Sequence, residues 1–158
     1  MIETAFAWAT VHEVGENVSS VSPEGPWSEH SVTTGRRWDH SSAVVGDKLY
    51  LLAGFHNEGS VESLEGGRWG EGTPPRFQIG FGSCAVSVRN KIIVMGGYRS
   101  ERKVQQWDLG TDQWTQLPEL NTGRKGHGCT VIGEQTIVVA GGRDGIVSGM
   151  RLKSSEMY

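Results

Sequence analysis

The chain has 158 residues and a formal net charge of −3, and its 23 glycines are roughly twice the usual share of that residue. A chain of this length fits one domain with a sizeable core, and glycines spread along it suit short strands joined by tight turns. The charge excludes the strongly basic surface used to bind nucleic acids or anionic membranes. No apolar run approaches the roughly 20 residues of a membrane-spanning helix.

The first 34 residues show the weakest strand pattern. Residues 18–21 predict one strand and Trp27 marks the next, while residues 5–8 predict an earlier strand that lacks its glycines. The N-terminus has neither the basic segment nor the apolar stretch of a signal peptide, and two cysteines are too few for a disulfide scaffold. We therefore expect an intracellular, cytoplasmic protein.

Two sets of four strands are predicted next, each an antiparallel meander. A two-residue turn, Gly46-Asp47 or Arg89-Asn90, joins the first two strands of each set. The strands are expected at residues 41–45, 48–52, 60–64 and from 67 onward, and then at residues 85–88, 91–95, 104–109 and 113–117. A third set has three strands, at residues 128–132, 136–140 and 154–158. The predicted units are residues 1–34, with strands two to four, then 35–75, 76–120 and 121–158.

An apolar run that ends in glycine occurs once in each of the last three units. The final glycines are Gly54, Gly97 and Gly142, which lie 43 and 45 residues apart. A fixed period in this range is typical of repeat proteins, in which each unit is too thin to bury both faces and stacks on its neighbours.

These residues resemble the kelch repeat over residues 27–158. The family pattern is a second strand that ends in two glycines, an aromatic residue on the third strand and a tryptophan on the fourth. The clearest copy has Gly96, Gly97, Trp107 in place of the usual tyrosine, and Trp114. The flanking copies carry Gly54 and Trp69 before it, and Gly141, Gly142 and Tyr158 after it. A WD40 array has a similar period, but the Trp-Asp pairs at 38–39 and 107–108 stand at different places in the repeat.

The resemblance implies an all-β, kelch-type β-propeller with about 3.5 four-stranded antiparallel blades, partial or open. Complete propellers have roughly 4–8 blades. We therefore expect a fragment, a partial gene product, or a chain that associates with itself or another chain through its open blade faces and edges.

Arginine stands before the first strand of each of the last three units, at Arg36, Arg76 and Arg124. Three guanidinium groups on one rim could bind carboxylates, and arginines at this place help kelch substrate adaptors bind acidic peptides. Phe55 and Tyr98 follow the glycines and are expected to add apolar contact. The alternative is that each arginine pairs with a loop carbonyl or a neighbouring acid.

Cys84 and Cys129 each lie 13 residues before the last glycine of their unit. We therefore expect equivalent, buried structural thiols with no disulfide between them. The histidines lack metal-ligand spacing, so hydrogen bonding between blades is expected of them. The sequence predicts neither a metal site nor a cofactor.

The function that fits best is a non-catalytic module that binds a protein or acidic peptide through rim loops. In a longer parent it would be the substrate-recognition part of a ubiquitin-ligase adaptor, or an actin-associated protein. The alternatives are a kelch enzyme of the copper-oxidase or sugar-mutarotase type, and a structural fragment without a function of its own. No catalytic triad order, P-loop or dinucleotide fingerprint occurs.

Overall fold

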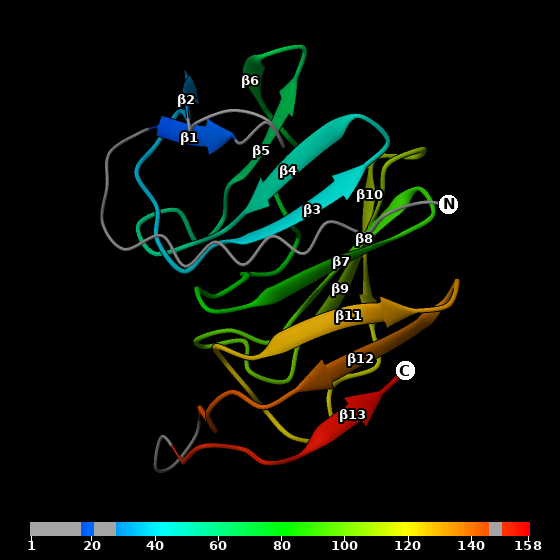
Figure 1. The fold of residues 1–158 in the computed structure, drawn as a ribbon. Helices are drawn as coiled ribbons and strands as arrows, with labels where there is room; N and C mark the ends of the chain where they lie inside the picture. The colour runs from blue at the N-terminus through cyan, green and yellow to red at the C-terminus, as the bar shows by residue number, and fades with distance from the viewer. Residues whose placement is uncertain (1–16, 21–27, 146–149) are drawn as a thin grey trace.

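The computed structural model describes residues 17–20, 28–145 and 150–158, and all regular structure in these ranges is β-strand (Figure 1). Over the same ranges there is no helix with the length and apolarity to cross a membrane. The all-β prediction is confirmed. The predicted strand at residues 5–8 and Trp27 lie outside the described residues, and the unit boundaries stay predictions.

The strands form four antiparallel sheets in which neighbours in sequence are neighbours in space. A two-stranded sheet comprises β1 (Asn17–Ser20) and β2 (Ser28–Val32). The first blade comprises β3 (Ser41–Val45), β4 (Lys48–Leu52), β5 (Val61–Glu65) and β6 (Arg68–Glu71). The second comprises β7 (Cys84–Val88), β8 (Lys91–Met95), β9 (Val104–Asp108) and β10 (Gln113–Leu117). The third comprises β11 (Gly128–Ile132), β12 (Thr136–Ala140) and β13 (Ser155–Met157).

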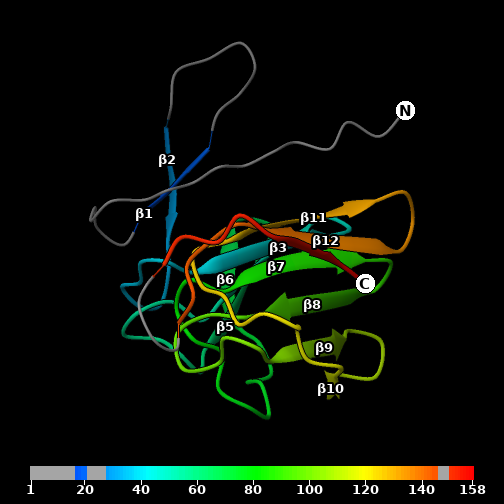
Figure 2. The same ribbon diagram turned by 90° about the horizontal axis from the view of Figure 1, so that it is seen from below.

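The inner strands β3, β7 and β11 lie side by side, and the rest of each blade extends away from them (Figures 1 and 2). Backbone hydrogen bonds join the segments that lead into these strands. The amide of Gly82 donates to the carbonyl of Asp39 over 2.8 Å, and the amide of Gly126 donates to the carbonyl of Gly82 over 2.7 Å. Three successive blades are thus held around one axis, as a partial kelch propeller requires.

Two apolar clusters fill the spaces between blades. One contains Leu52 from the first blade with Ile92 and Trp107 from the second, and the other contains Ile93 from the second with Val139 from the third. Successive side chains of a strand point to opposite faces, so β8 contributes to both clusters and is buried on both faces. The second blade is therefore the middle layer of the described fold.

The double glycine stands where the start of a blade crosses the end of its second strand. Gly97 has φ +99°, and a Cβ atom there would lie 2.5 Å from the carbonyl oxygen of Gly80. Only glycine fits such a contact without displacing the backbone. This steric requirement explains why glycine recurs at the end of the second strand.

The tryptophans pack as the repeat pattern predicts. The rings of Trp107 and Trp114 stack with centroids 5.5 Å apart, and the Trp114 indole donates to the carbonyl of Thr73 over 3.0 Å. Tyr158, the counterpart of Trp107, is 63% exposed, whereas Trp107 is 4% exposed. The described residues place no strand on the outer side of β13, so nothing there covers Tyr158 as β10 covers Trp107.

Candidate functional site

Two segments of each blade meet at one end of the fold. One leads into the inner strand, and the other leaves the second strand. An amide of the second segment donates to a carbonyl of the first at 2.8 or 2.9 Å in all three blades, which makes the paired residues structurally equivalent. We call these six residues the rim; the pairs, in chain order, are Trp38 with Phe55, Phe81 with Tyr98, and Lys125 with Arg143.

The rim is aromatic in the first two blades. The ring centroids of Trp38 and Phe55 are 4.7 Å apart, and that of Phe81 lies 5.5 Å from Trp38 and 5.4 Å from Phe55. Tyr98 stacks on Phe81 at 4.8 Å. Trp38 and Tyr98 are still 39% and 36% exposed. A cluster of large rings that stays this accessible is typical of a binding surface.

The rim is cationic in the third blade. Lys125 Nζ lies 4.8 Å from the ring centroid of Tyr98, and the guanidinium carbon of Arg99 lies 5.3 Å from it. Arg143 is exposed and pairs through its backbone with both Lys125 and Arg151. None of these four cations forms an ion pair with a carboxylate of the described residues. Their charge is available to an anionic ligand.

A shallow groove of about 360 Å³ opens beside the aromatic part of the rim. Phe55, Phe81 and Tyr98 supply its apolar lining, and the remaining lining residues are Glu58, Gln78 and Arg99. An apolar lining with a few polar groups is the usual composition of a recognition site.

The three arginines predicted to act together do not occupy equivalent places. Because the rim pairs make Trp38, Phe81 and Lys125 equivalent, the residues directly before them are also equivalent, and these are Arg37, Gly80 and Arg124. Arg36 and Arg76 are exposed in the preceding segments, where Arg76 lies 5.8 Å from the ring of Phe77. The structure therefore does not bring Arg36, Arg76 and Arg124 together as one set.

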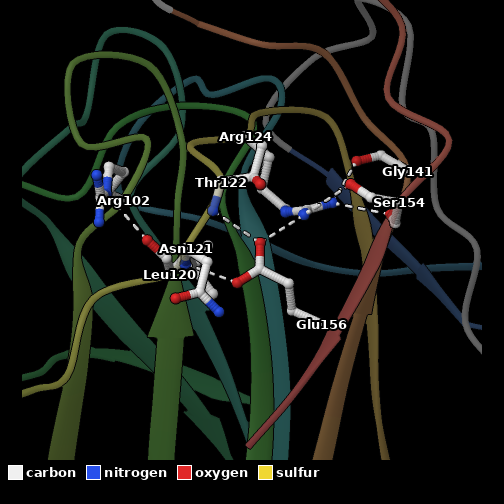
Figure 3. A network of polar contacts seen from close by, with 8 residues as sticks. All are labelled: Arg102, Leu120, Asn121, Thr122, Arg124, Gly141, Ser154 and Glu156. Atoms are coloured by element: carbon white, nitrogen blue, oxygen red, sulfur yellow. Dashed lines mark hydrogen bonds and ion pairs between the residues drawn. The ribbon is translucent and has the colours of Figure 1, made fainter.

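Arg124 is 0% exposed and binds within its own blade (Figure 3). Its guanidinium donates to the carbonyls of Gly141 and Ser154 at 3.0 and 3.2 Å and to the carboxylate of Glu156 at 2.7 Å. The expectation that Arg124 faces a partner is therefore wrong. Its N–H groups donate to loop carbonyls and to a neighbouring acid, which was the alternative expected from the sequence. The first blade repeats the arrangement, with an ion pair between Arg37 and Glu62.

We call these two pairs, Arg37 with Glu62 and Arg124 with Glu156, the charged clips. In the third blade the carboxylate of the clip also holds the segment that leads into the inner strand. Glu156 accepts hydrogen bonds from the amides of Asn121 and Thr122 at 2.6 and 2.9 Å. Burial raises the pKa of Glu156, but the hydrogen bonds from Arg124, Thr122 and Asn121 outweigh burial and keep this pKa below its usual value. The buried charges therefore tie the third strand to the start of the blade.

The second blade fills the same places with neutral groups. Gln105 stands where the other blades have Glu62 and Glu156, and its amide exchanges two hydrogen bonds with the backbone of Phe77 at 3.1 and 3.3 Å. Ser100 donates to the carbonyl of Gly96 over 2.8 Å, as an arginine does to the equivalent carbonyl in the other blades. The blade is thus closed without charge.

A family model described as the kelch motif matches residues 80–121, which include the whole second blade. The chain is a kelch-repeat protein. Kelch-like protein terF of Aspergillus terreus is 30% identical over 125 residues, which is 67% of this chain and 27% of that protein. Acyl-CoA-binding domain-containing protein 4 and F-box/kelch-repeat protein SKIP20, both of Arabidopsis thaliana, are 25% and 26% identical over 83% and 77% of this chain. The chain spans only 24% and 29% of those two relatives.

The structure overturns the prediction of two free thiols, because a disulfide joins Cys84 to Cys129. Counting back from the last glycine makes these residues look equivalent, but the hairpin of the third kelch blade has a three-residue turn. Cys84 pairs with Met95, whereas Cys129 pairs with Val139 rather than with the equivalent Ala140. A shift of one residue turns a side chain to the opposite face of a strand. The two sulfur atoms therefore face each other between β7 and β11, with Cα atoms 6.0 Å apart.

The buried histidines of the kelch blades do not make the predicted hydrogen bonds. Neither ring nitrogen of His127 nor Nδ1 of His40 has a hydrogen-bond partner among the described residues. Burial, followed by the charge of Arg124, lowers the pKa of His127 to about 4, so its ring is neutral near pH 7. No group of three or more histidine, cysteine, aspartate or glutamate side chains that could hold a metal occurs in the described residues.

Four of the six rim residues were missed in the sequence: Trp38, Phe81, Lys125 and Arg143. The sequence did contain a positional signal for the first two of these residues, Trp38 and Phe81. Trp38 and Phe81 both lie 16 residues before the last glycine of their units, which marks a recurring aromatic position. The predicted residues Phe55 and Tyr98 do lie together, within one aromatic cluster bridged by Phe81.

Proposed function

We propose that this kelch chain is a non-catalytic protein-binding module and that the rim is its contact surface. Kelch-repeat relatives are interaction proteins in general, and the chain shares their blades. The observation that carries the proposal is the continuous row of accessible aromatic and cationic side chains at one end of three adjacent blades. Large aromatic residues beside arginine are the usual energetic centre of protein interfaces.

The proposed partner is an acidic protein segment. Lys125, Arg99 and Arg143 supply the positive charge, and Phe55 and Tyr98 supply the apolar contact. Arg36 and Arg76 remain predicted contributors at the margin of this surface, since both are exposed. Charged groups of this kind steer an acidic partner and fix its position more than they add affinity.

The cellular role is proposed from the relatives alone. The printed name of one relative joins an F-box to kelch repeats. A cytoplasmic substrate-recognition part of a ubiquitin-ligase adaptor is therefore our first choice of role, with an actin-associated protein as the second. Self-association is a further part of the proposal, supported by Ile132 and Met157, which are exposed on the third blade.

Binding of an immobilised set of acidic protein segments to the purified chain tests the proposal. We expect binding that is lost in the charge reversals Lys125→Glu and Arg143→Glu and retained in Arg89→Glu, which lies in the turn at the opposite end of the second blade. Equal loss of binding in Arg89→Glu would place the contact elsewhere, and no binding to any segment would reject an acidic partner. Light scattering of the purified chain, with a stable monomer as the contrary result, tests self-association separately.

A further inference from the structure

We propose that the rim recognises a two-part motif: an aromatic side chain held in the groove against Phe55 and Phe81, directly next to acidic residues held by Lys125 and Arg143. The inference rests on the proposed function and adds the chemistry of the partner, including the apolar anchor that an acidic segment alone lacks. Its support lies in how the rings are tilted, where the cations lie and how the blades are joined.

The ring geometry favours an inserted side chain over a flat ligand. The planes of Phe55 and Phe81 meet at 82°, and that of Trp38 is tilted by 35° and 47° to them. These three rings are not coplanar and therefore offer no single flat platform on which a broad planar ligand could stack. Rings at right angles instead enclose a corner that suits edge-to-face contact with another aromatic ring, and such contacts add about 0.5–1.5 kcal/mol beyond the buried area.

Tyr98 is the boundary between the two halves. One part of its surface stacks on Phe81, with centroids 4.8 Å apart, and Lys125 Nζ lies 4.8 Å from its ring. Tyr98 therefore belongs to both halves, since it also lines the groove together with Phe55 and Phe81. Because Lys125 contacts Tyr98, which itself stacks on Phe81, we expect the acidic residue to adjoin the aromatic residue.

The backbone fixes the order of the two halves. The hydrogen bonds from Gly82 to Asp39 and from Gly126 to Gly82 hold the three rim segments in register. The aromatic half therefore always lies over the first two blades and the cationic half over the third. A ligand that contacts both halves must cross the boundary between β7 and β11, which an extended peptide can do.

Fluorescence anisotropy with three fluorescein-labelled synthetic peptides tests the inference on the full chain. All three share one glycine–serine background: one carries a phenylalanine followed by a run of glutamates, one has alanine for the phenylalanine, and one has lysines for the glutamates. We expect the first peptide to bind about tenfold more tightly than either of the others, since a buried aromatic anchor is typically worth more than 1 kcal/mol. Higher ionic strength should weaken the first two peptides and leave the aromatic contribution unchanged.

Variants assign each half to its residues. Phe81→Ala should remove the difference between the phenylalanine and alanine peptides while glutamate dependence persists, and Lys125→Glu should reduce the preference for the glutamate peptides over the lysine peptide. Arg89→Glu, in the turn of the opposite end, should change neither comparison. Phe55→Ala gives a second test of the aromatic corner, and unfolding curves show whether each variant is folded.

Rim-dependent binding that is equal with and without the phenylalanine would overturn the inference and leave the proposed function standing. Failure of all three peptides to bind would overturn the inference, and the separate set of acidic segments would still decide the proposed function.

Discussion

In the first and third blades a buried arginine pairs with a glutamate, the buried Glu62 or the partly exposed Glu156, and the pair ties the third strand to the start of the blade, whereas in the second blade the same places hold Gly80 and Gln105. Both solutions satisfy the carbonyl at the end of the second strand and the amide three residues before Arg37, Gly80 or Arg124. The charged one carries the cost of removing two charges from water, and the neutral one needs a backbone close enough for Ser100 to replace the guanidinium. An arginine at the start of a kelch blade can therefore stabilise the fold rather than bind a partner.

The largest effect is expected from breaking the charged clip. Glu156→Ala leaves the guanidinium of Arg124 buried without its carboxylate, and we expect a loss of about 4 kcal/mol in the free energy of unfolding, measured in urea. Gln105→Ala in the second blade removes only neutral hydrogen bonds and should cost about 1 kcal/mol. Glu119→Ala, which removes an exposed ion pair with Lys103, is the surface control. Equal losses in Glu156→Ala and Gln105→Ala would contradict the distinction between the blades.

The disulfide gives the next largest effect. It closes a loop of 45 residues between the second and third blades, so replacing Cys84 and Cys129 by serine should cost about 3 kcal/mol. At the boundary between the first and second blades, Ser41, the counterpart of Cys84, shares a hydrogen bond with Ser83 instead, and Ser41→Ala should cost about 1 kcal/mol. Mass spectrometry of the native, alkylated protein checks the bond itself. Alkylation of both thiols without a reductant would show that they are free.

The third effect depends on pH and arises at His127. Its pKa is about 4 in the folded chain against the usual 6.5, so the unfolded chain binds more protons between these values. Its contribution to stability is complete above about pH 6.5 and declines as the pH falls toward 4, by about 2 kcal/mol between pH 7 and pH 5. In the second blade Ser83 occupies this place and does not titrate there. Urea unfolding of His127→Gln should show less dependence on pH than the parent chain, and an unchanged dependence would assign the effect to other groups.

The smallest loss of stability is expected at Gly80, where the second blade differs from the other two. A Cβ atom there would collide with the carbonyl oxygen of Tyr98, although the equivalent places carry Arg37 and Arg124. We expect Gly80→Ala to cost about 1.5 kcal/mol, because the neutral blade needs this close backbone contact. The matched control is Gly128→Ala, at a glycine where a Cβ atom would meet nothing within 4 Å. Equal stability of the two variants would mean that the second blade adjusts at no cost.

Most strands could be predicted because their signals are local. Alternation, two-residue turns and the double glycine placed β3, β4 and β10 at the residues where the structure has them. The residues of the candidate site were harder to predict from the sequence. Phe55 and Tyr98 were found because they follow the glycines, but Trp38 and Phe81 come before the inner strands, where no single residue type recurs in all three blades.

One extra residue accounts for two of the errors. The turn of the third-blade hairpin has three residues where the other two hairpins have two. Distances counted from the last glycine are therefore one residue too long in the third blade. That count matched Arg36 instead of Arg37 to Arg124, and it made Cys84 and Cys129 appear to face the same way.

The repeat, the order of the strands and the places that require glycine can be read along the chain, because each depends on neighbouring residues and on the backbone. The side chains that meet across blades, in the disulfide, the charged clips and the rim, become known only from the folded structure. This is because the face of a strand on which a side chain lies reverses with every residue. A single inserted residue leaves the repeat recognisable and still changes its contacts.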